Sequence, residues 1–246
     1  MDPDIDAIFR YKKLAVWREC GFEIVGQAIS VRSAVSYIKN SGTELAICFE
    51  KPPDLDAVKL TEGLSDIEGT SCIVVSPDIS PERMRACFLN GAADFIHAPA
   101  SETTLKECLS RAVTHIKAKG AAAEYRAAVE EYFSELRKTV ADETLLDALE
   151  TFIAENENNV ASTQSAAEYF GFNKDYFGRL FRKKTGMTFG EFYKRFRMIY
   201  AEKLLISGRY KVNEISGMLG FATPDYFTSE FRKYSGRRPL EVKKQK

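Results

Sequence analysis

The stretches DYFGRLFRKKTG, at Asp175–Gly186, and DYFTSEFRKYSG, at Asp225–Gly236, are two copies of one sequence pattern. Seven of their twelve positions are identical at an offset of fifty residues. Such agreement within one chain indicates an internal repeat, so we expect the C-terminal part to contain one structural unit twice.

Each copy predicts an amphipathic helix with one apolar stripe and one polar, largely basic face. The apolar side chains recur at the spacing of a single helical face, and we expect them to be buried. They are Tyr176, Phe177, Leu180 and Phe181 in the first copy and Tyr226, Phe227 and Phe231 in the second.

A short helix and a glycine precede each copy, which is the order of a helix-turn-helix unit. Residues 163–170 and 212–219 predict the short helices, and the turns fall at Gly171 and Gly220, where the backbone needs freedom. A longer helix over residues 189–206 links the two units.

Residues that favour helix starts stand at the expected places. Asn173 and Thr223 predict the N-caps of the two repeated helices, and Pro224 suits a first helical position. Asp142 predicts the N-cap of an opening helix over residues 143–155.

This pattern resembles the AraC/XylS-type DNA-binding domain over about Leu145–Lys243. Ser216 departs from the family, which usually has alanine at that position, but a hydroxyl is small enough to be tolerated. The matching residues, spread through both units in the order of the family, are Ala167, Gly171, Leu180, Phe181, Gly186, Arg197, Ala201, Leu204, Leu205, Val212, Ile215, Gly220, Phe221, Tyr226, Phe227, Phe231, Gly236 and Pro239.

The resemblance implies that one monomer reads two half-sites, with its two recognition helices in successive major grooves about 34 Å apart. Arg179 is the strongest candidate for reading guanine, because its guanidinium matches the O6 and N7 acceptors. The positions that should meet base edges are Asp175, Gly178, Arg179, Pro224, Asp225, Thr228 and Ser229. The positions that should meet phosphates are Lys174, Arg182, Lys183, Arg232 and Lys233.

Two alternatives stay open for these side chains. Asp175 and Asp225 could read cytosine, but they also lie in a first helical turn, where a carboxylate is favoured by the helix dipole. We favour the second role for them. The lysines and arginines could form a solvated basic surface without touching phosphate.

The net charge of zero conceals two halves of opposite sign. Residues 171–246 contain eighteen Lys and Arg against seven Asp and Glu, whereas residues 1–170 contain seventeen against twenty-eight. The basic half suits a phosphate backbone, and the acidic half should lie away from it.

The N-terminal part alternates strand-like and helical segments, which predicts a parallel sheet with helices on both faces. The expected helices are residues 31–39, 55–64, 81–89 and 103–116. The expected strands are Phe22–Ala28, Leu45–Phe49, Ser71–Ser76 and Asp94–His97.

This order, with the phrases WRECGFEIVGQA and NGAADFIHAP, resembles the receiver domain of response regulators over about Asp2–His115. The resemblance implies a flavodoxin-like α/β fold whose first strand is missing from the pattern. Either the remaining four strands close up or another segment fills the vacant place.

The phosphorylation site of that family is degenerate here. Phe49 stands at the phosphoacceptor aspartate and Ala98 at the lysine that would pair with the phosphoryl group, whereas Ser76 retains the switch hydroxyl. Asp2 and Asp4 only echo the acidic pair that would hold Mg²⁺, so we expect no metal.

Glu50, next to the lost phosphoacceptor, has two interpretations. It could be a fixed mimic of a phosphate, or the solvated end of a strand. Because side chains alternate along a strand, Glu50 should point to the face opposite Phe49, which favours the solvated end.

Residues 119–142 predict a helical connector between a receiver-like domain, residues 1–118, and the DNA-binding domain, residues 143–246. Its apolar residues follow a narrow helical stripe. This stripe could pair with a second chain in a coiled coil, or the helix could lie on one of the domains. The stripe residues are Tyr125, Val129, Tyr132, Leu136 and Val140.

The sequence favours neither an enzyme nor a cofactor-binding protein. It contains no GxGxxG or GxxxxGK(S/T) loop, and only two histidines, His97 and His115. The five cysteines lack CxxC spacing, so we expect buried, reduced thiols in a cytoplasmic protein with no membrane segment.

We therefore predict a bacterial-type, sequence-specific transcription regulator that is not an enzyme and is not controlled by phosphorylation. Promoter DNA is the expected partner, and RNA polymerase is a further candidate. The alternative is an interaction or ligand-sensing module with vestigial DNA binding.

Overall fold

The computed structural model describes residues 13–67, 69–157 and 160–243. The chain forms two units, Met1–Gly120 and Ala121–Lys246, each with its own core. Asp2 and Asp4, weighed above as metal ligands, lie outside the described residues. Within the described residues, none of the helices combines the length and apolarity of a membrane span.

The N-terminal unit contains, within the described residues, a sheet of three parallel strands. β1 (Leu45–Phe49), β2 (Ser71–Ser76) and β3 (Ala92–His97) lie side by side in that order. All six residues of β2 are buried, as expected of a central strand that is covered on both faces.

Helices cover both faces of this sheet. The face formed by residues such as Ala46 and Val74 packs on three helices, and the face formed by residues such as Ile73 packs on two. The helices on the first face are α3 (Val31–Ser41), α4 (Ala57–Leu64) and α5 (Pro81–Leu89). Those on the second face are α2 (Val16–Glu19) and the part of α6 (Glu102–Leu136) that lies in this unit.

The prediction of a strand at Phe22–Ala28 is wrong. The segment forms no strand in the structure, and Ile24 and Val25 are exposed. The carbonyl oxygen of Val25 accepts a hydrogen bond from the Tyr37 hydroxyl, at 2.6 Å, instead of a sheet hydrogen bond. Neither expected answer to the missing first strand holds within the described residues, because β1 forms an edge of a smaller sheet.

The C-terminal unit is entirely helical within its described residues. The predicted opening helix, short helices, linking helix and repeated helices are all present, with ends within one residue of those expected. They are α7 (Glu143–Glu155), α8 (Thr163–Tyr169), α9 (Lys174–Thr185), α10 (Phe189–Ser207), α11 (Val212–Met218) and α12 (Pro224–Ser235), followed by α13 (Pro239–Lys243).

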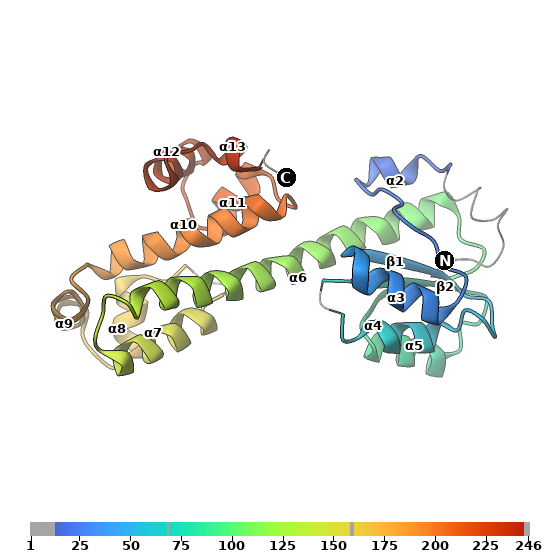
Figure 1. Ribbon diagram of the computed structural model, residues 1–246, viewed down its shortest axis with the longest axis horizontal. Coiled ribbons are helices and arrows are strands. Elements are labelled where there is room, and N and C mark those ends of the chain that lie inside the picture. The colour runs from blue at the N-terminus through green and yellow to red at the C-terminus, as the bar shows by residue number, and fades with distance from the viewer. Residues whose placement is uncertain (1–12, 68, 158–159, 244–246) are drawn as a thin grey trace. The chain divides into compact units, whose positions relative to one another are not determined.

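α10 is the central helix of this unit. It links α9 to α11 in the chain (Figure 1) and contacts α9, α11, α12 and α13. Ten of its side chains are buried, among them Phe192 and Phe196. A helix with apolar side chains on several sides must pack against other elements on each of those sides, and the neighbouring helices provide these contacts for α10.

The second half of α6, from Ala121 on, belongs to this unit, which contradicts one of the two open interpretations, the pairing of its stripe with a second chain. All five stripe residues, from Tyr125 to Val140, are buried in the core of their own unit. The hydroxyls of Tyr125 and Tyr132 donate hydrogen bonds to the carbonyl oxygens of Ile153 and Phe192, at 2.6 and 2.8 Å. The other interpretation, a helix lying on a domain, is confirmed.

Candidate nucleic-acid interface

The two recognition helices, α9 and α12, start in the way their sequences predict. The Asn173 side chain accepts a hydrogen bond from the Tyr176 backbone N–H at 2.9 Å, and Thr223 accepts one from Tyr226 at 3.2 Å. Pro224 is the first residue of α12. These caps satisfy backbone donors that would otherwise be unpaired and so fix where each helix begins.

A glycine with positive φ lies at the C-terminal end of each recognition helix, and another lies in the turn before it. Gly186 and Gly236 cap the C-termini at φ values of 77° and 74°. Gly171 and Gly220 make the preceding turns at 71° and 69°. Only glycine adopts this backbone without strain, which explains why both units have glycine at these places.

Phenylalanines anchor both helices to the core, but the tyrosines beside them do not. Phe177, Phe181, Phe227 and Phe231 are at most 3% exposed. Tyr176 and Tyr226 are 45% and 54% exposed, so their predicted burial is wrong. The two phenylalanines of each helix are four residues apart and so share one face, which is buried. The tyrosine directly before the first phenylalanine is rotated from it by about 100° around the helix axis and therefore lies off that face.

The opposite faces of both helices carry the side chains that we expect at DNA. Two of these residues, Gly178 and Thr228, are half-buried, and the rest are exposed. The exposed ones are Lys174, Asp175, Arg179, Arg182 and Lys183 on α9 and Pro224, Asp225, Ser229, Arg232 and Lys233 on α12. The structure therefore gathers each predicted set on one surface, and contact with bases or phosphates stays a prediction.

Arg238 is a member of the α12 surface that sequence reasoning missed. It lies just before α13 and lines a shallow hollow together with Arg232 and Lys233. Asp225, Thr228 and Ser229 line the rest of the hollow. Three cations and the Asp225 carboxylate line the hollow, and one of the cations, Lys233, also pairs with Glu230. The cations still outnumber these carboxylates, so the hollow is suited to an anion.

Two charged side chains behind the interface hold α12 in place. The carboxylate of Glu230 is buried and pairs with Lys194 of α10 and with Lys233. Arg197, also on α10, donates a hydrogen bond to the carbonyl oxygen of Leu219 at 2.8 Å, and its guanidinium carbon lies 4.3 Å from the centre of the Phe221 ring. These contacts join α10 to the turn and helix of the second unit.

The three residues predicted to form a degenerate phosphorylation site have an apolar environment on one side. Phe49 and Ala98 pack against the cluster around Val16 and Trp17. Ser76, at the end of β2, is fully buried, and its hydroxyl donates to Glu50 at 2.5 Å. The three predicted site residues are thus divided between two environments.

Glu50 is not the solvated strand end that we favoured, because only 8% of the residue is exposed. It does point away from the cluster that contains Phe49, as alternation predicts. Its carboxylate accepts hydrogen bonds from the Ala57 backbone N–H at 2.9 Å and from Arg83 Nε at 3.1 Å, besides Ser76. An ion pair with Arg83 completes the cluster.

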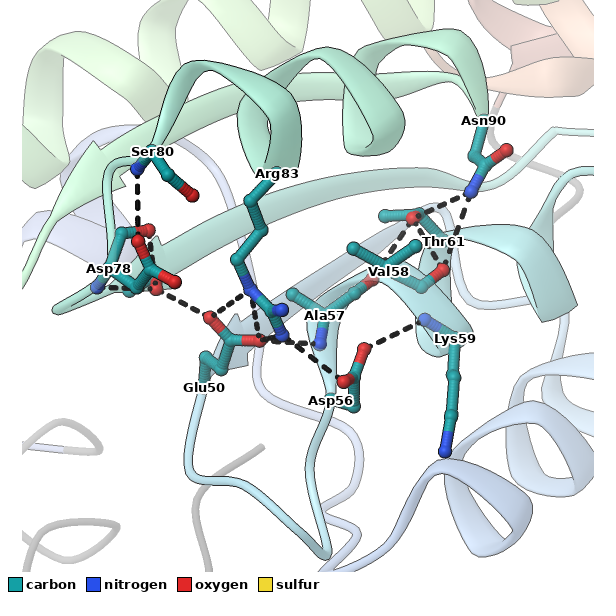
Figure 2. Close-up of polar contacts among 11 residues, drawn as sticks. Glu50, Asp56, Ala57, Val58, Lys59, Thr61, Asp78, Ser80, Arg83 and Asn90 are labelled. Atoms are coloured by element: carbon teal, nitrogen blue, oxygen red, sulfur yellow. Dashed lines mark hydrogen bonds and ion pairs between the residues drawn. The ribbon is translucent and has the colours of Figure 1, made fainter.

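This cluster joins four elements of the N-terminal unit: the ends of β1 and β2 and the starts of α4 and α5 (Figure 2). Arg83 also pairs with Asp56, at 3.1 Å, which caps α4 through the Lys59 backbone N–H. Burial alone would raise the pKa of Glu50, but hydrogen bonds from Arg83, Ser76 and Ala57 hold that pKa below its usual value. Sequence reasoning missed Arg83, because nothing in the sequence pairs it with a residue 33 positions away.

The cysteines carry no sign of a reactive site. Cys48, Cys72, Cys87 and Cys108 are buried and free, and Cys20 is half-buried and free. Burial raises the pKa of Cys48 to about 12, so its thiol stays protonated at neutral pH. Among the described residues, no group of three or more His, Cys, Asp or Glu side chains is arranged to hold a metal ion.

The family model described as "Helix-turn-helix domain" matches residues 166–245, which include both recognition helices. These residues form an AraC-type helix-turn-helix domain. Domains of the AraC type bind DNA and regulate transcription. In this chain the AraC-type domain is completed by α7 and by the second half of α6, which share its core.

Relatives resemble the chain over nearly its whole length. An uncharacterised response regulatory protein of Staphylococcus epidermidis is 24% identical over 234 residues, covering 95% of this chain and 92% of the relative. The transcriptional regulatory protein HptR of Staphylococcus aureus is 24% identical over 237 residues, with the same coverage. Among solved structures, the C-terminal domain of the two-component response regulator yesN of Fusobacterium nucleatum is 26% identical, covers 34% of this chain and 81% of its own, and has a TM-score of 0.32.

Proposed function

We propose that this protein is a sequence-specific transcription regulator in which each monomer binds two half-sites in promoter DNA through α9 and α12. One observation carries the proposal: two helices related by an internal repeat each bury a phenylalanine pair and expose a polar face on which cations outnumber carboxylates. A duplicated interface on one central helix suits a repeating ligand such as the DNA major groove.

We further infer that the regulator works without phosphorylation of its receiver-like unit. A phenyl ring at Phe49 cannot accept a phosphoryl group, and Ala98 offers no charge to stabilise one. Ser76 is already engaged by Glu50. Control then comes from a protein partner, a small molecule or the amount of protein, and RNA polymerase is the partner expected at a promoter.

The proposal is tested by selecting duplexes that the full-length protein binds from a random-sequence pool at physiological salt. Affinity is then measured for a selected duplex and for a mixed-sequence duplex. We expect the selected sequence to be bound 10³-fold or more tightly, the lower range for specific regulators. Equal affinity for both duplexes would contradict the proposal and favour a vestigial DNA surface.

A further inference from the structure

The identical positions of the internal repeat fall into two groups: those explained by folding and those that are exposed. Three of the seven identical positions are explained by folding, because two are buried phenylalanines and one is a glycine at a helix end. The other four pairs are exposed. They are Asp175 and Asp225, Tyr176 and Tyr226, Arg182 and Arg232, and Lys183 and Lys233.

The two tyrosines differ from the other exposed pairs, because an aromatic ring gains little from folding when half of it faces water. Each ring nevertheless contacts an aromatic ring of the preceding turn. The ring centroids of Tyr176 and Phe172 are 5.2 Å apart, and those of Tyr226 and Phe221 are 6.0 Å apart. These contacts restrict the orientation of both tyrosine rings at the first turn of their helices, while part of each ring stays exposed.

Helical spacing places the tyrosines at the border of the basic face. Tyr176 lines up with Arg179 and Lys183, three and seven residues further on, and Tyr226 stands in the same relation to Lys233. In a helix docked in a groove, side chains at the border meet the sugar–phosphate walls, whereas those along the middle meet base edges. A tyrosine hydroxyl is a suitable donor to a phosphate oxygen.

We propose that Tyr176 and Tyr226 are equivalent phosphate anchors, one in each half-site, whose hydroxyls each donate a hydrogen bond to a DNA phosphate oxygen. The inference rests on the proposed DNA-binding function and adds two contact residues to it. Because tyrosine is uncharged, it strengthens binding to every sequence without releasing a counterion.

The test replaces Tyr176→Phe, Tyr226→Phe and both together in the full-length protein, which removes the hydroxyls and keeps the rings. Affinity is measured over a salt series for a selected duplex and for a mixed-sequence duplex. Losing one hydrogen bond to a charged acceptor should weaken binding to both duplexes by roughly tenfold or more. The double variant should lose about the product of the two factors, and the salt slope should not change.

Tyr234→Phe is the matched control on α12. Tyr234 is 43% exposed, and the first copy of the repeat has Lys184 at its position. Partial burial and the nearby carboxylates of Glu135, Glu202 and Glu131 raise the pKa of Tyr234, which places it beside acidic side chains. DNA affinity of the control should be unchanged, and melting curves should show that all variants fold.

Each outcome is decisive. Unchanged affinity in the double variant overturns the inference while leaving the proposed function intact. A loss confined to the selected duplex would assign the tyrosines to base reading, and a flatter salt slope would mean a disturbed cationic contact; both contradict phosphate anchoring by the hydroxyl. Absence of selective binding by the unaltered protein overturns the proposed function, and this inference with it.

Discussion

At the scale of single residues, Arg179 and Arg232 occupy different places on their helices although both are exposed. Arg179 lies one turn into α9, where we predict contact with base edges, and its counterpart in the repeat is Ser229. Arg232 belongs to an identical pair and lines the cationic hollow next to α13. We therefore expect specificity from Arg179 and general affinity from Arg232.

Arg179→Ala should cost roughly 1–3 kcal/mol and blur the preference at one base position, because a bidentate guanine contact is lost. Arg232→Ala should weaken binding to all duplexes alike and reduce the magnitude of the salt slope by about 1. Selection from a random pool and affinity against salt measure these two effects. Exchanged phenotypes would show that the two assignments are wrong.

Glu50 carries a buried charge in the N-terminal unit, since its side chain is only 1% exposed. Glu50→Gln should lower the free energy of unfolding by about 2–3 kcal/mol, because Arg83 and Ser76 lose an ionised partner inside the protein. Asp94→Asn is the control. Arg111, the partner of Asp94, is 58% exposed, so this variant should lose less than about 1 kcal/mol.

The contribution of Glu50 should also depend on pH. Its folded pKa is lowered, so the stabilisation is present above the unfolded pKa, near 4.3, and is lost as pH falls from there through the folded pKa. Urea unfolding between pH 7 and pH 3 should thus show a smaller gap between the original protein and Glu50→Gln at the acid end. A gap that widens on acidification would contradict the ion pair.

At the scale of elements, the turn glycines of the two helix-turn-helix units share a positive φ but differ in their surroundings. A Cβ added to Gly171 would meet no atom within 4 Å, whereas one added to Gly220 would lie 2.5 Å from a methyl carbon of Val160. The second turn is therefore packed against the segment between α7 and α8, and the first turn is open.

Gly171→Ala should cost roughly 1–2 kcal/mol, the strain of alanine in a left-handed conformation. Gly220→Ala should cost about 1 kcal/mol more, because Val160 must also move. Combining Gly220→Ala with Val160→Ala should remove that excess, which a double-mutant cycle by chemical denaturation measures. An equal loss in the free energy of unfolding for the two glycine variants would show that the Val160 side chain moves aside without a measurable energetic cost.

At the scale of the whole molecule, the second half of α6 is part of the AraC-type unit. Tyr125, Tyr132, Phe133 and Leu136 are all buried in its core. Their loss would remove on the order of 10 kcal/mol of burial, comparable to the total stability of a domain. A boundary drawn at residue 143 from the sequence cuts through this core.

A fragment of residues 121–246 should therefore unfold cooperatively and bind the selected duplex, whereas residues 143–246 should show no cooperative transition. Circular dichroism melting curves and duplex binding of the two fragments test this expectation. Cooperative unfolding of the shorter fragment at the same temperature would mean that α6 adds no stability to the unit.

The sequence by itself determined the double helix-turn-helix, its caps and turns, and the alternation of the N-terminal unit. These features depend on local preferences: helical spacing, side chains that cap backbone donors, and glycines that accept positive φ. Phe177 and Gly186 were placed correctly for that reason.

Only the tertiary structure decided whether Phe22–Ala28 pairs as a strand, whether Glu50 is solvated, which side chains of α9 face water, and what covers the stripe of α6. Each of these outcomes depends on a partner far away in the chain. Arg83 binds Glu50, 33 residues away, and the carbonyl oxygen of Phe192 accepts a hydrogen bond from the Tyr132 hydroxyl, 60 residues away. Strand pairing and side-chain burial each require two surfaces that meet, and a local sequence pattern describes only one of those two surfaces.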